Sequence, residues 1–350
     1  MNRKKSFANL LKITCVMVCS CIGTQLVWAD KTDSESITDT AMGTDCSVRV
    51  FGSDGTAKDI MDMLSDIENK YLSWRIEGSD IANINENASE SEPVMPSKWT
   101  YSYLENVLDL ARKSSGAFDP TLGRVSQLWN LESDNPYIPS KSELTELLLE
   151  TGWEKISLSD GEVFLKDSVQ IDLGAVGKGI GCDEARKMLE EADADAAVVS
   201  VGGSILTYGK KPDGKPWKIG IANPRNEDGE SYLGSLTIDG TCSISTSGDY
   251  EKYVIEDGVR YHHILDPATG KPANHGVISA TIVSKDGTLA DGLSTSLFIM
   301  GKDKAIEYWR AHSDEFDMIL YDKENKEKLN IELLGKDTGN SEKLNILKDT

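Results

Sequence analysis

The chain has 350 residues, of which 39% are hydrophobic, enough to bury a large core in one big domain or two closely packed ones. The formal net charge is −21 and the isoelectric point is near 4.6. Nucleic-acid-binding proteins concentrate lysine and arginine, so this charge argues against nucleic acid as a partner. A polyanionic ligand would need a local cation, a metal ion or helix N-termini to bind such an acidic protein.

The N-terminus is predicted to be an export signal and not part of the fold. Basic residues at positions 3–5 precede an apolar run over residues 10–28, and Ala29 ends a stretch that meets the small-residue rule for signal peptidase. Residues 1–29 are therefore predicted to be a signal peptide. Residues 30–40, which are rich in Ser, Thr and Asp, are predicted to be a tether.

The same segment allows a second interpretation. Residues 18–21 form a loose lipobox, which would make Cys21 a lipidated N-terminal residue and associate the protein with a membrane. No later stretch of the sequence is long and apolar enough to span a bilayer. Under both interpretations we expect an exported protein, either periplasmic or on the extracytoplasmic face of the cell membrane.

Three cysteines, Cys46, Cys182 and Cys242, follow the predicted signal peptide. Their number is odd, their spacing is wide, and they form neither a C-x-x-C pair nor a zinc pattern. We interpret them as buried thiols, with one disulfide among them as the alternative.

After residue 41, the first half of the chain is predicted to contain more helix than strand. Alternating residues predict a strand over 46–51, and a strand pair is predicted over 153–165 around an Asp160-Gly161 turn. Apolar residues at helical spacing predict helices over residues 55–73, 99–113, 122–129 and 139–149. Trp74, which follows the first of these helices, is either a core residue or a flat wall against a planar ligand.

A strand runs into a glycine-rich turn over residues 169–179, and this turn opens a helix over 179–191. Backbone N–H groups, a helix N-terminus and Lys178 come close to one point, which is an arrangement that can bind phosphate. The pattern is neither Walker A nor G-x-G-x-x-G, and taken alone it also fits a tight strand–helix turn without a ligand. The strands predicted next are residues 196–201, 216–224, 233–238 and 242–246.

The densest pattern covers residues 245–301, where two short strands joined by an Asp-Gly turn lead to His262 and His263. A β-rich run follows, and then a helix start that carries Asp291 and Thr295. Residues four apart share one face of a helix, and both side chains offer the hard oxygen atoms that magnesium or calcium accepts. The spacing alone is weak support for a metal site, since many solvated helices carry an acid and a threonine one turn apart.

Taken together, these motifs resemble the ApbE family, the FAD:protein FMN transferases. Each motif is weak alone, but they occur in family order. The matching pieces are Met42-Gly43-Thr44, Ser73-Trp74-Arg75, Ser115-Gly116-Ala117-Phe118-Asp119, the run from Ile171 to Gly179, Val201-Gly202-Gly203, Pro216-Trp217, Thr246-Ser247-Gly248-Asp249-Tyr250, His263-Ile264-Leu265-Asp266-Pro267, Thr269-Gly270, and Ala290-Asp291 with Ser294-Thr295. The resemblance implies an α+β fold of the T-fold type. It would be a two-lobed single domain over residues 41–335 with the cofactor cleft between its lobes, followed by a flexible tail over 336–350.

The resemblance also implies roles for individual residues. The positions that match contacts to FAD are Met42, Trp74, Ala117, Phe118, Asp119, Asp172, Lys178 and Ile264. The positions that match magnesium ligands are Ala175, through its backbone carbonyl, and the side chains of Asp291 and Thr295. Trp74 stands where family members often have tyrosine, which should preserve stacking but leaves the pocket width open.

The histidines are treated separately. His263 stands at the family's histidine position and is the predicted general base, with a structural hydrogen bond as its alternative role. His262 is expected to be incidental. His275 could line the cleft, but no role is assigned to it.

The activity implied by the resemblance is the magnesium-dependent attachment of FMN to a serine or threonine of an exported acceptor protein. The acceptor hydroxyl attacks the FMN-side phosphorus of FAD, and AMP leaves. The metal and Lys178 would offset charge that develops on the phosphoryl and leaving oxygens. The chain has no good match to the family's acceptor signature, so we expect the modified residue on another protein, such as a redox-complex subunit or an exported reductase.

Three other functions are weighed against this one. An FAD pyrophosphatase would use the same metal site and water to produce FMN and AMP, and the sequence barely separates it from a transferase. Loss of Asp291 or Thr295 would favour an FAD-binding or storage protein, and both residues are present. A structural exported domain without a ligand does not explain so many glycine and acid positions kept in one order.

Overall fold

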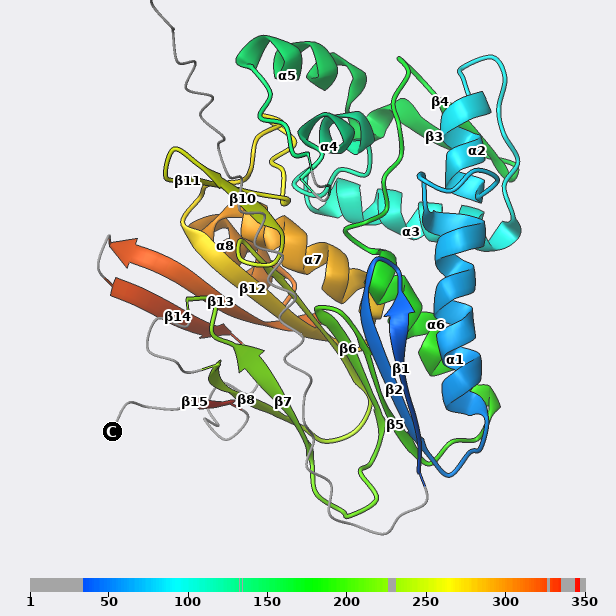
Figure 1. The fold of residues 1–350 in the computed structure, drawn as a ribbon, viewed down its shortest axis with the longest axis vertical. Coiled ribbons are helices and arrows are strands. Elements are labelled where there is room, and N and C mark those ends of the chain that lie inside the picture. Colours follow the sequence, from blue (N-terminus) through cyan, green and yellow to red (C-terminus); the bar gives the residue numbers. More distant parts are fainter. Residues whose placement is uncertain are drawn as a thin grey trace, which may run out of the picture.

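The computed structural model describes residues 34–325, apart from 132, 134 and 226–230, together with 328–334 and 344–346. A large antiparallel sheet forms one half of the molecule, and helices with small hairpins form a second lobe at one end of that sheet (Figure 1). The mixed α and β architecture implied by the resemblance is confirmed. The predicted signal peptide and Cys21 lie outside the described residues.

Eight strands form the main sheet, in the order β1-β2-β5-β6-β9-β12-β13-β14. Their bounds are β1 Ser34–Ala41, β2 Thr44–Phe51, β5 Ala196–Val201, β6 Ser204–Gly209, β9 Cys242–Gly248, β12 Val277–Ser284, β13 Phe316–Asn325 and β14 Lys328–Leu334. A second sheet contains β7 Trp217–Ala222, β8 Tyr232–Ile238 and β15 Leu344–Ile346. Two hairpins complete the strands: β3 Ile156–Ser159 with β4 Glu162–Leu165, and β10 Tyr253–Glu256 with β11 Val259–His262.

The helices fall into two groups. Those on one face of the main sheet are α1 Thr56–Ile67, α6 Gly177–Glu191, α7 Gly287–Met300 and α8 Lys302–Ala311. Those of the second lobe are α2 Asp80–Asn87, α3 Lys98–Lys113, α4 Gly123–Trp129 and α5 Lys141–Leu147, and the β3-β4 and β10-β11 hairpins lie with them (Figure 1). Short turns of other helix types are Glu68–Leu72 (π) and Leu148–Glu150 and Trp153–Lys155 (3₁₀).

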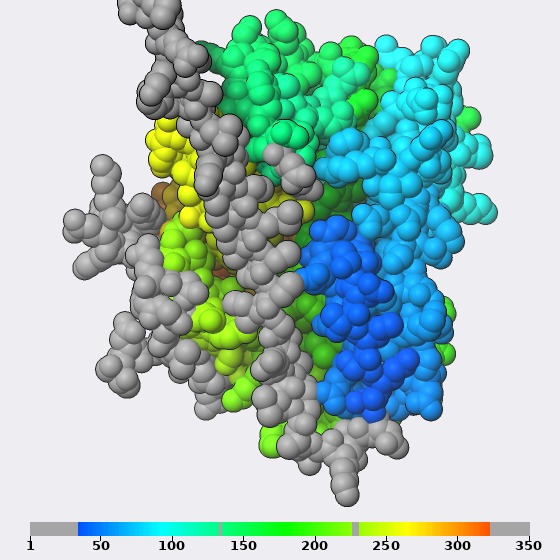
Figure 2. All heavy atoms as spheres, in the orientation of Figure 1, coloured from blue at the N-terminus to red at the C-terminus, as the bar shows by residue number. Residues whose placement is uncertain are grey.

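Strand alternation explains how the main sheet is covered on both faces. On β12, Ala280 and Ile282 belong to the large core under the helices, whereas Val283 packs with the core beneath β7 and β8. Successive side chains of a strand point to opposite faces, so one strand serves both layers. The large core also contains second-lobe residues such as Ile84 and Leu104, so apolar packing continues from one lobe into the other. Figure 2 shows cyan atoms of the second lobe next to the blue atoms of the N-terminal part of the described chain.

The prediction of a tether over residues 30–40 is wrong for residues 34–40. Ser34–Ala41 is β1, which pairs with β2 along its whole length, from Ser34 opposite Phe51 to Ala41 opposite Thr44. The polar composition misleads because β1 is an edge strand and most of its side chains are not buried. Residues 30–33 lie outside the described part of the chain.

Most predicted elements are confirmed, with shifted ends. The first predicted helix changes at Glu68 from α to π geometry, and the helix after the glycine-rich turn begins at Gly177 and not at Gly179. No helix was predicted at Asp80–Asn87, where α2 lies. Part of the predicted flexible tail, Leu344–Ile346, pairs with β8 as a strand; the remainder of 336–350 lies outside the described residues.

Cys46, Cys182 and Cys242 are free thiols, which excludes a disulfide among them and confirms the prediction of buried thiols for the first two. Cys46 and Cys182 are buried, and Cys242 is half-buried. Burial raises the pKa of the Cys46 thiol to about 11. Within the described residues, no helix combines the length and apolar character needed to cross a membrane.

Candidate functional site

A cleft with a volume of about 350 Å³ lies where the second lobe meets the helix-covered end of the main sheet. It brings together segments that are far apart in the sequence, from the β1–β2 turn to α7. The predicted site residues that line it are Met42, Trp74, Ala117, Phe118, Asp119, Asp172, Ala175, Lys178, His263, Ile264 and Thr295. The remaining predicted residue, Asp291, lies behind this lining, with one carboxylate oxygen 3.6 Å from the ammonium of Lys178.

Met42 is held by its backbone. It occupies the turn between β1 and β2 with a φ of 54°, a left-handed conformation that is uncommon for a residue with a side chain. Its N–H donates to the Glu68 carboxylate at 2.6 Å. Glu68 begins the π-helical turn, so this irregular turn anchors the hairpin tip at the cleft.

The glycine-rich turn also lines the cleft. Asp172 accepts a hydrogen bond from the Gly174 N–H at 2.9 Å, which stabilises the turn that leads into α6. Lys178 is in the first turn of α6, where backbone N–H groups and the helix dipole favour an anion. The glycine-rich turn, the start of α6 and Lys178 therefore come together at the cleft, and phosphate binding there stays a prediction.

Asp291 and Thr295 come from α7. Asp291 is 2% exposed, and its two oxygens accept hydrogen bonds from the Gly179 N–H at 2.9 Å and from the Ser204 hydroxyl at 3.2 Å. Thr295, one turn later, lies 3.0 Å from the Ser247 hydroxyl oxygen. A carboxylate, a hydroxyl and the carbonyl of Ala175 are all hard oxygen ligands, so this donor set fits a magnesium ion.

No second metal-binding cluster is evident elsewhere in the described part of the chain. No cluster of three or more His, Cys, Asp or Glu side chains with metal-binding geometry occurs among the described residues. Asp291 is the one carboxylate among the predicted ligands of a cation at this site. Magnesium retains water and binds substrate phosphates readily, so such a sparse set of ligands is typical for it.

The three histidines of this region have different surroundings. His263 lines the cleft, and its Nδ1 lies 3.2 Å from the carbonyl oxygen of Lys252. His262 is buried, its Nε2 lies 2.9 Å from the carbonyl oxygen of Ala273, and burial lowers its pKa, which fits the expectation that it has no catalytic part. His275 contacts Asp266 at 3.3 Å and is absent from the cleft lining.

Trp74 and Asp119 have structural contacts as well as a place in the cleft. The Arg75 guanidinium lies 4.1 Å from the Trp74 ring centroid, and the Trp74 indole nitrogen is buried with no hydrogen-bond partner among the described residues. The Asp119 carboxylate accepts hydrogen bonds from the backbone and hydroxyl of Thr121 at 2.9 and 2.6 Å. Its pKa is raised by burial. That carboxylate therefore holds its own loop together.

Glu251 is a cleft residue that the sequence reasoning missed. Burial raises its pKa to about 7, with Lys178 acting to lower it and Asp291 to raise it. A Cβ atom on Gly203 would lie 2.9 Å from the backbone oxygen of Thr246 and 3.2 Å from the Glu251 carboxylate, so the glycine lets both approach. Glu251 directly follows the matched segment that ends at Tyr250, and this adjacency was the available signal.

Comparisons with known proteins identify the family of the chain. The model of the ApbE family matches residues 42–320. The FAD:protein FMN transferase of Treponema pallidum is 34% identical over 286 residues, which cover 75% of this chain and 78% of that protein. The protein of the same name from Vibrio cholerae is 31% identical over 288 residues, covering 80% and 85%.

Solved structures give the same result for the fold. The flavin transferase ApbE from Vibrio cholerae superposes with a TM-score of 0.79 at 26% identity, covering 88% of this chain and 99% of that one. The ApbE protein from Thermotoga maritima gives a TM-score of 0.78 at 33% identity, covering 88% and 98%. Since the family model spans most of the chain and most of the matched motifs contribute residues to one cleft, the chain belongs to the ApbE family.

Proposed function

We propose that this chain transfers FMN from FAD to a serine or threonine hydroxyl of an acceptor protein and releases AMP. The observation that carries the proposal is the single cleft lined by the predicted flavin-contacting residues, Lys178 and His263, with Asp291 behind Lys178. The printed names of the relatives, FAD:protein FMN transferases, support the same reaction.

Magnesium held by Asp291, Thr295 and the Ala175 carbonyl would supply Lewis-acid stabilisation of negative charge on the pyrophosphate. Lys178 and the N-terminus of α6 provide positive potential from the protein itself. The metal ion and these positive groups of the protein would act against the net charge of −21 that the chain carries. The net negative charge opposes the approach of a dianionic pyrophosphate, so local positive charge in the cleft favours its binding.

The proposed reaction exchanges one phosphorus–oxygen bond for another. The acceptor hydroxyl oxygen bonds to the FMN-side phosphorus, and the bond from that phosphorus to the bridging oxygen breaks. AMP leaves with the bridging oxygen, and the proton of the hydroxyl passes to His263. Lys178 offsets charge on the phosphoryl oxygens during this exchange.

The surroundings of His263 support its part as the base. A backbone carbonyl can only accept a hydrogen bond, so the contact of 3.2 Å between Nδ1 and the Lys252 oxygen places the hydrogen of the neutral ring on Nδ1. The lone pair is then on Nε2. That tautomer can take a proton from a hydroxyl group in the cleft.

The proposal is tested by intact-mass spectrometry. The protein is incubated with FAD, magnesium and a candidate exported redox-complex subunit, and the acceptor is weighed before and after. An added FMN on a serine or threonine supports the transferase. Free FMN and AMP with an unchanged acceptor mass would instead support an FAD pyrophosphatase, and intact bound FAD would support a storage protein.

A further inference from the structure

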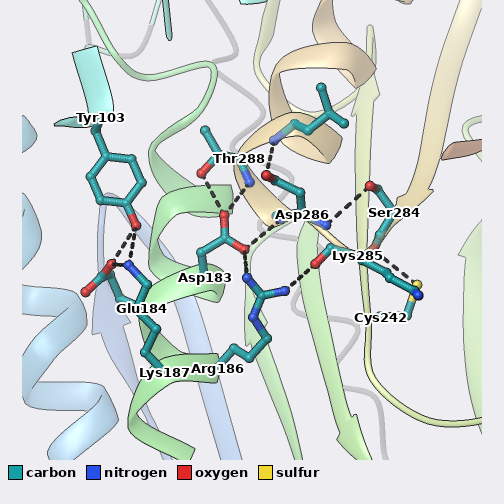
Figure 3. A network of polar contacts seen from close by, with 12 residues as sticks. Tyr103, Asp183, Glu184, Arg186, Lys187, Cys242, Ser284, Lys285, Asp286 and Thr288 are labelled. Carbon is teal, nitrogen blue, oxygen red and sulfur yellow. Dashed lines mark hydrogen bonds and ion pairs between the residues drawn. The ribbon is translucent and has the colours of Figure 1, made fainter. Parts of the chain in front are cut away.

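Asp183 is a buried carboxylate on α6 that does not line the cleft. It accepts three hydrogen bonds from the start of α7: from the Gly287 N–H at 2.8 Å, the Thr288 N–H at 2.8 Å and the Thr288 hydroxyl at 2.7 Å (Figure 3). Arg186 adds a contact of 3.3 Å. A side chain of one helix therefore caps the N-terminus of another.

Every N–H group that the start of α7 leaves without a helical partner is bonded. The Asp286 N–H donates to the Ser284 hydroxyl at 3.3 Å, and the Leu289 N–H donates to the Asp286 carboxylate at 2.8 Å. The two N–H groups between them, those of Gly287 and Thr288, both depend on Asp183. Removing the Asp183 carboxylate would therefore leave two buried donors unpaired.

The contact is reciprocal. Asp291 of α7 accepts the Gly179 N–H in the first turn of α6, just as Asp183 of α6 accepts the Gly287 N–H in the first turn of α7. Each carboxylate follows its own helix's glycine by one turn. The two glycines touch: a Cβ on Gly179 would lie 2.1 Å from the Gly287 oxygen, and a Cβ on Gly287 would lie 2.6 Å from the Gly179 oxygen.

These polar contacts contribute to where α7 lies along its axis. The helix is buried on nearly all sides, with Leu293, Leu297 and Phe298 in the large core. Close packing and the Gly179–Gly287 contact restrict the helix, and the hydrogen bonds of Asp183 and Asp291 add directional contacts that favour one axial position. A slip of one residue moves a helix by about 1.5 Å, which is large against the near-ideal oxygen geometry that magnesium demands.

We propose that Asp183 is a positioning residue that fixes α7 axially against α6 and thereby holds Asp291 and Thr295 in the geometry a divalent cation needs. This inference rests on the proposed metal site. The contact between Asp183 and α7 would thus influence metal binding in the cleft, although Asp183 contacts neither the cleft nor the oxygen atoms of the proposed ligands.

The test compares Asp183→Asn with the control Asp286→Ala. The asparagine keeps the shape of the side chain but replaces one accepting oxygen by an NH₂ group. The control removes a cap that α7 supplies to itself, so it weakens the helix start without releasing α7 from α6. For each protein, binding of Mn²⁺ in the presence of FAD is measured by electron paramagnetic resonance, and the melting temperature is recorded.

We expect Asp183→Asn to weaken Mn²⁺ binding at least tenfold and Asp286→Ala to change it less than twofold, at similar losses of melting temperature. Equal weakening by both variants, or wild-type affinity in Asp183→Asn, would overturn the proposal. Should Asp183→Asn not fold, Thr288→Val removes one hydrogen bond of the same contact, and an affinity unchanged by this variant counts against the proposal equally.

A second measurement does not depend on metal. Hydrogen exchange of the Gly179 amide reports its bond to Asp291, and it should become at least tenfold faster in Asp183→Asn but not in Asp286→Ala. If the wild-type protein binds no Mn²⁺, the proposed metal site fails and the exchange rates alone decide the role of Asp183. Unchanged exchange at Gly179 would show that α7 keeps its position without Asp183.

Discussion

Glu251 is a carboxyl group whose charge depends on its place in the cleft. Its pKa is raised to about 7, first by burial, while Lys178 and Lys252 act to lower it and Asp291 acts to raise it. At neutral pH this side chain is therefore divided between its neutral and charged forms in the absence of ligand. The cleft lining thus contains one acid whose charge differs from what the sequence suggests.

The first prediction concerns Glu251→Gln. A pKa raised from 4.5 to about 7 favours the protonated form in the folded state, so its stabilising effect is complete below pH 4.5 and lost as the pH rises through 7. Glutamine stays neutral and avoids this loss. We expect the variant to gain about 2 kcal/mol of unfolding free energy at pH 8 relative to pH 5. Urea unfolding of the variant and the wild type, without metal or FAD, measures the difference in unfolding free energy at each pH. An equal difference at pH 5 and pH 8 would contradict the prediction.

The second prediction concerns His263→Ala. Loss of a general base commonly slows chemistry 10²- to 10⁴-fold, so we expect kcat for FMN transfer to fall by about that factor. The dissociation constant of FAD should change much less. His275→Ala is the matched control, because His275 does not line the cleft. An unchanged rate in His263→Ala would leave His263 with its hydrogen bond to Lys252 as a structural role.

The third prediction concerns Trp74→Ala. Stacking of a flat ring on an aromatic side chain contributes about 1–3 kcal/mol, so FAD binding should weaken by about tenfold or more. Trp74→Tyr, which keeps an aromatic face, should stay close to the wild type. The affinity is read from flavin fluorescence on titration. If alanine binds FAD as tightly as tryptophan does, Trp74 serves the core and the Arg75 contact alone.

At the scale of elements, the crossing of α6 and α7 sets how Lys178 of α6 lies relative to Asp291 and Thr295 of α7. The fourth prediction is that Gly179→Ala destabilises the protein by about 1–3 kcal/mol or more, because the new methyl group would lie 2.1 Å from a backbone oxygen of α7. Gly174→Ala is the control, since its added carbon meets only the Asp172 side chain, at 3.1 Å. Similar melting temperatures for the two variants would show that α6 and α7 can move apart to accommodate the methyl group at little cost in stability.

Elements differed in how well their sequences predicted them. The β10-β11 hairpin was predicted because an Asp-Gly turn joins two alternating runs, and the structure confirms it. β1 was missed because a polar edge strand has the composition of a linker. The Asp183 cap could not have been predicted, since it joins residues 104 and 105 positions apart and depends on how two helices cross.

At the scale of the whole molecule, the cleft is built from both lobes, and one large core runs through both. A ligand bound there stabilises the folded state of the entire chain by linkage. The fifth prediction is that FAD at 100 times its dissociation constant adds about 2.7 kcal/mol to the unfolding free energy. Part of this gain should disappear with EDTA. A melting temperature unaffected by EDTA in the presence of FAD would argue against a metal at Asp291.

The site was predictable from the sequence to the extent that its residues occur in recognisable motifs. Lys178, His263 and Thr295 were named from short patterns, and the fold brings them to one cleft. Glu251 was missed because its importance comes from burial beside two charged neighbours, which no local pattern encodes. Contacts between distant segments, such as that of Asp291 with Gly179, follow from packing and needed the structure.

The direction of β1 has a consequence for how the molecule would be held at a surface. The strand begins at Ser34, opposite Phe51, and ends at Ala41, next to Met42 in the cleft. The arrow of β1 points toward the second lobe (Figure 1). Eight extended residues span about 25 Å. An attachment to a surface before Ser34 would therefore join the molecule at the end of β1 that is far from the cleft. The cleft would then lie on the side of the molecule that faces away from the surface.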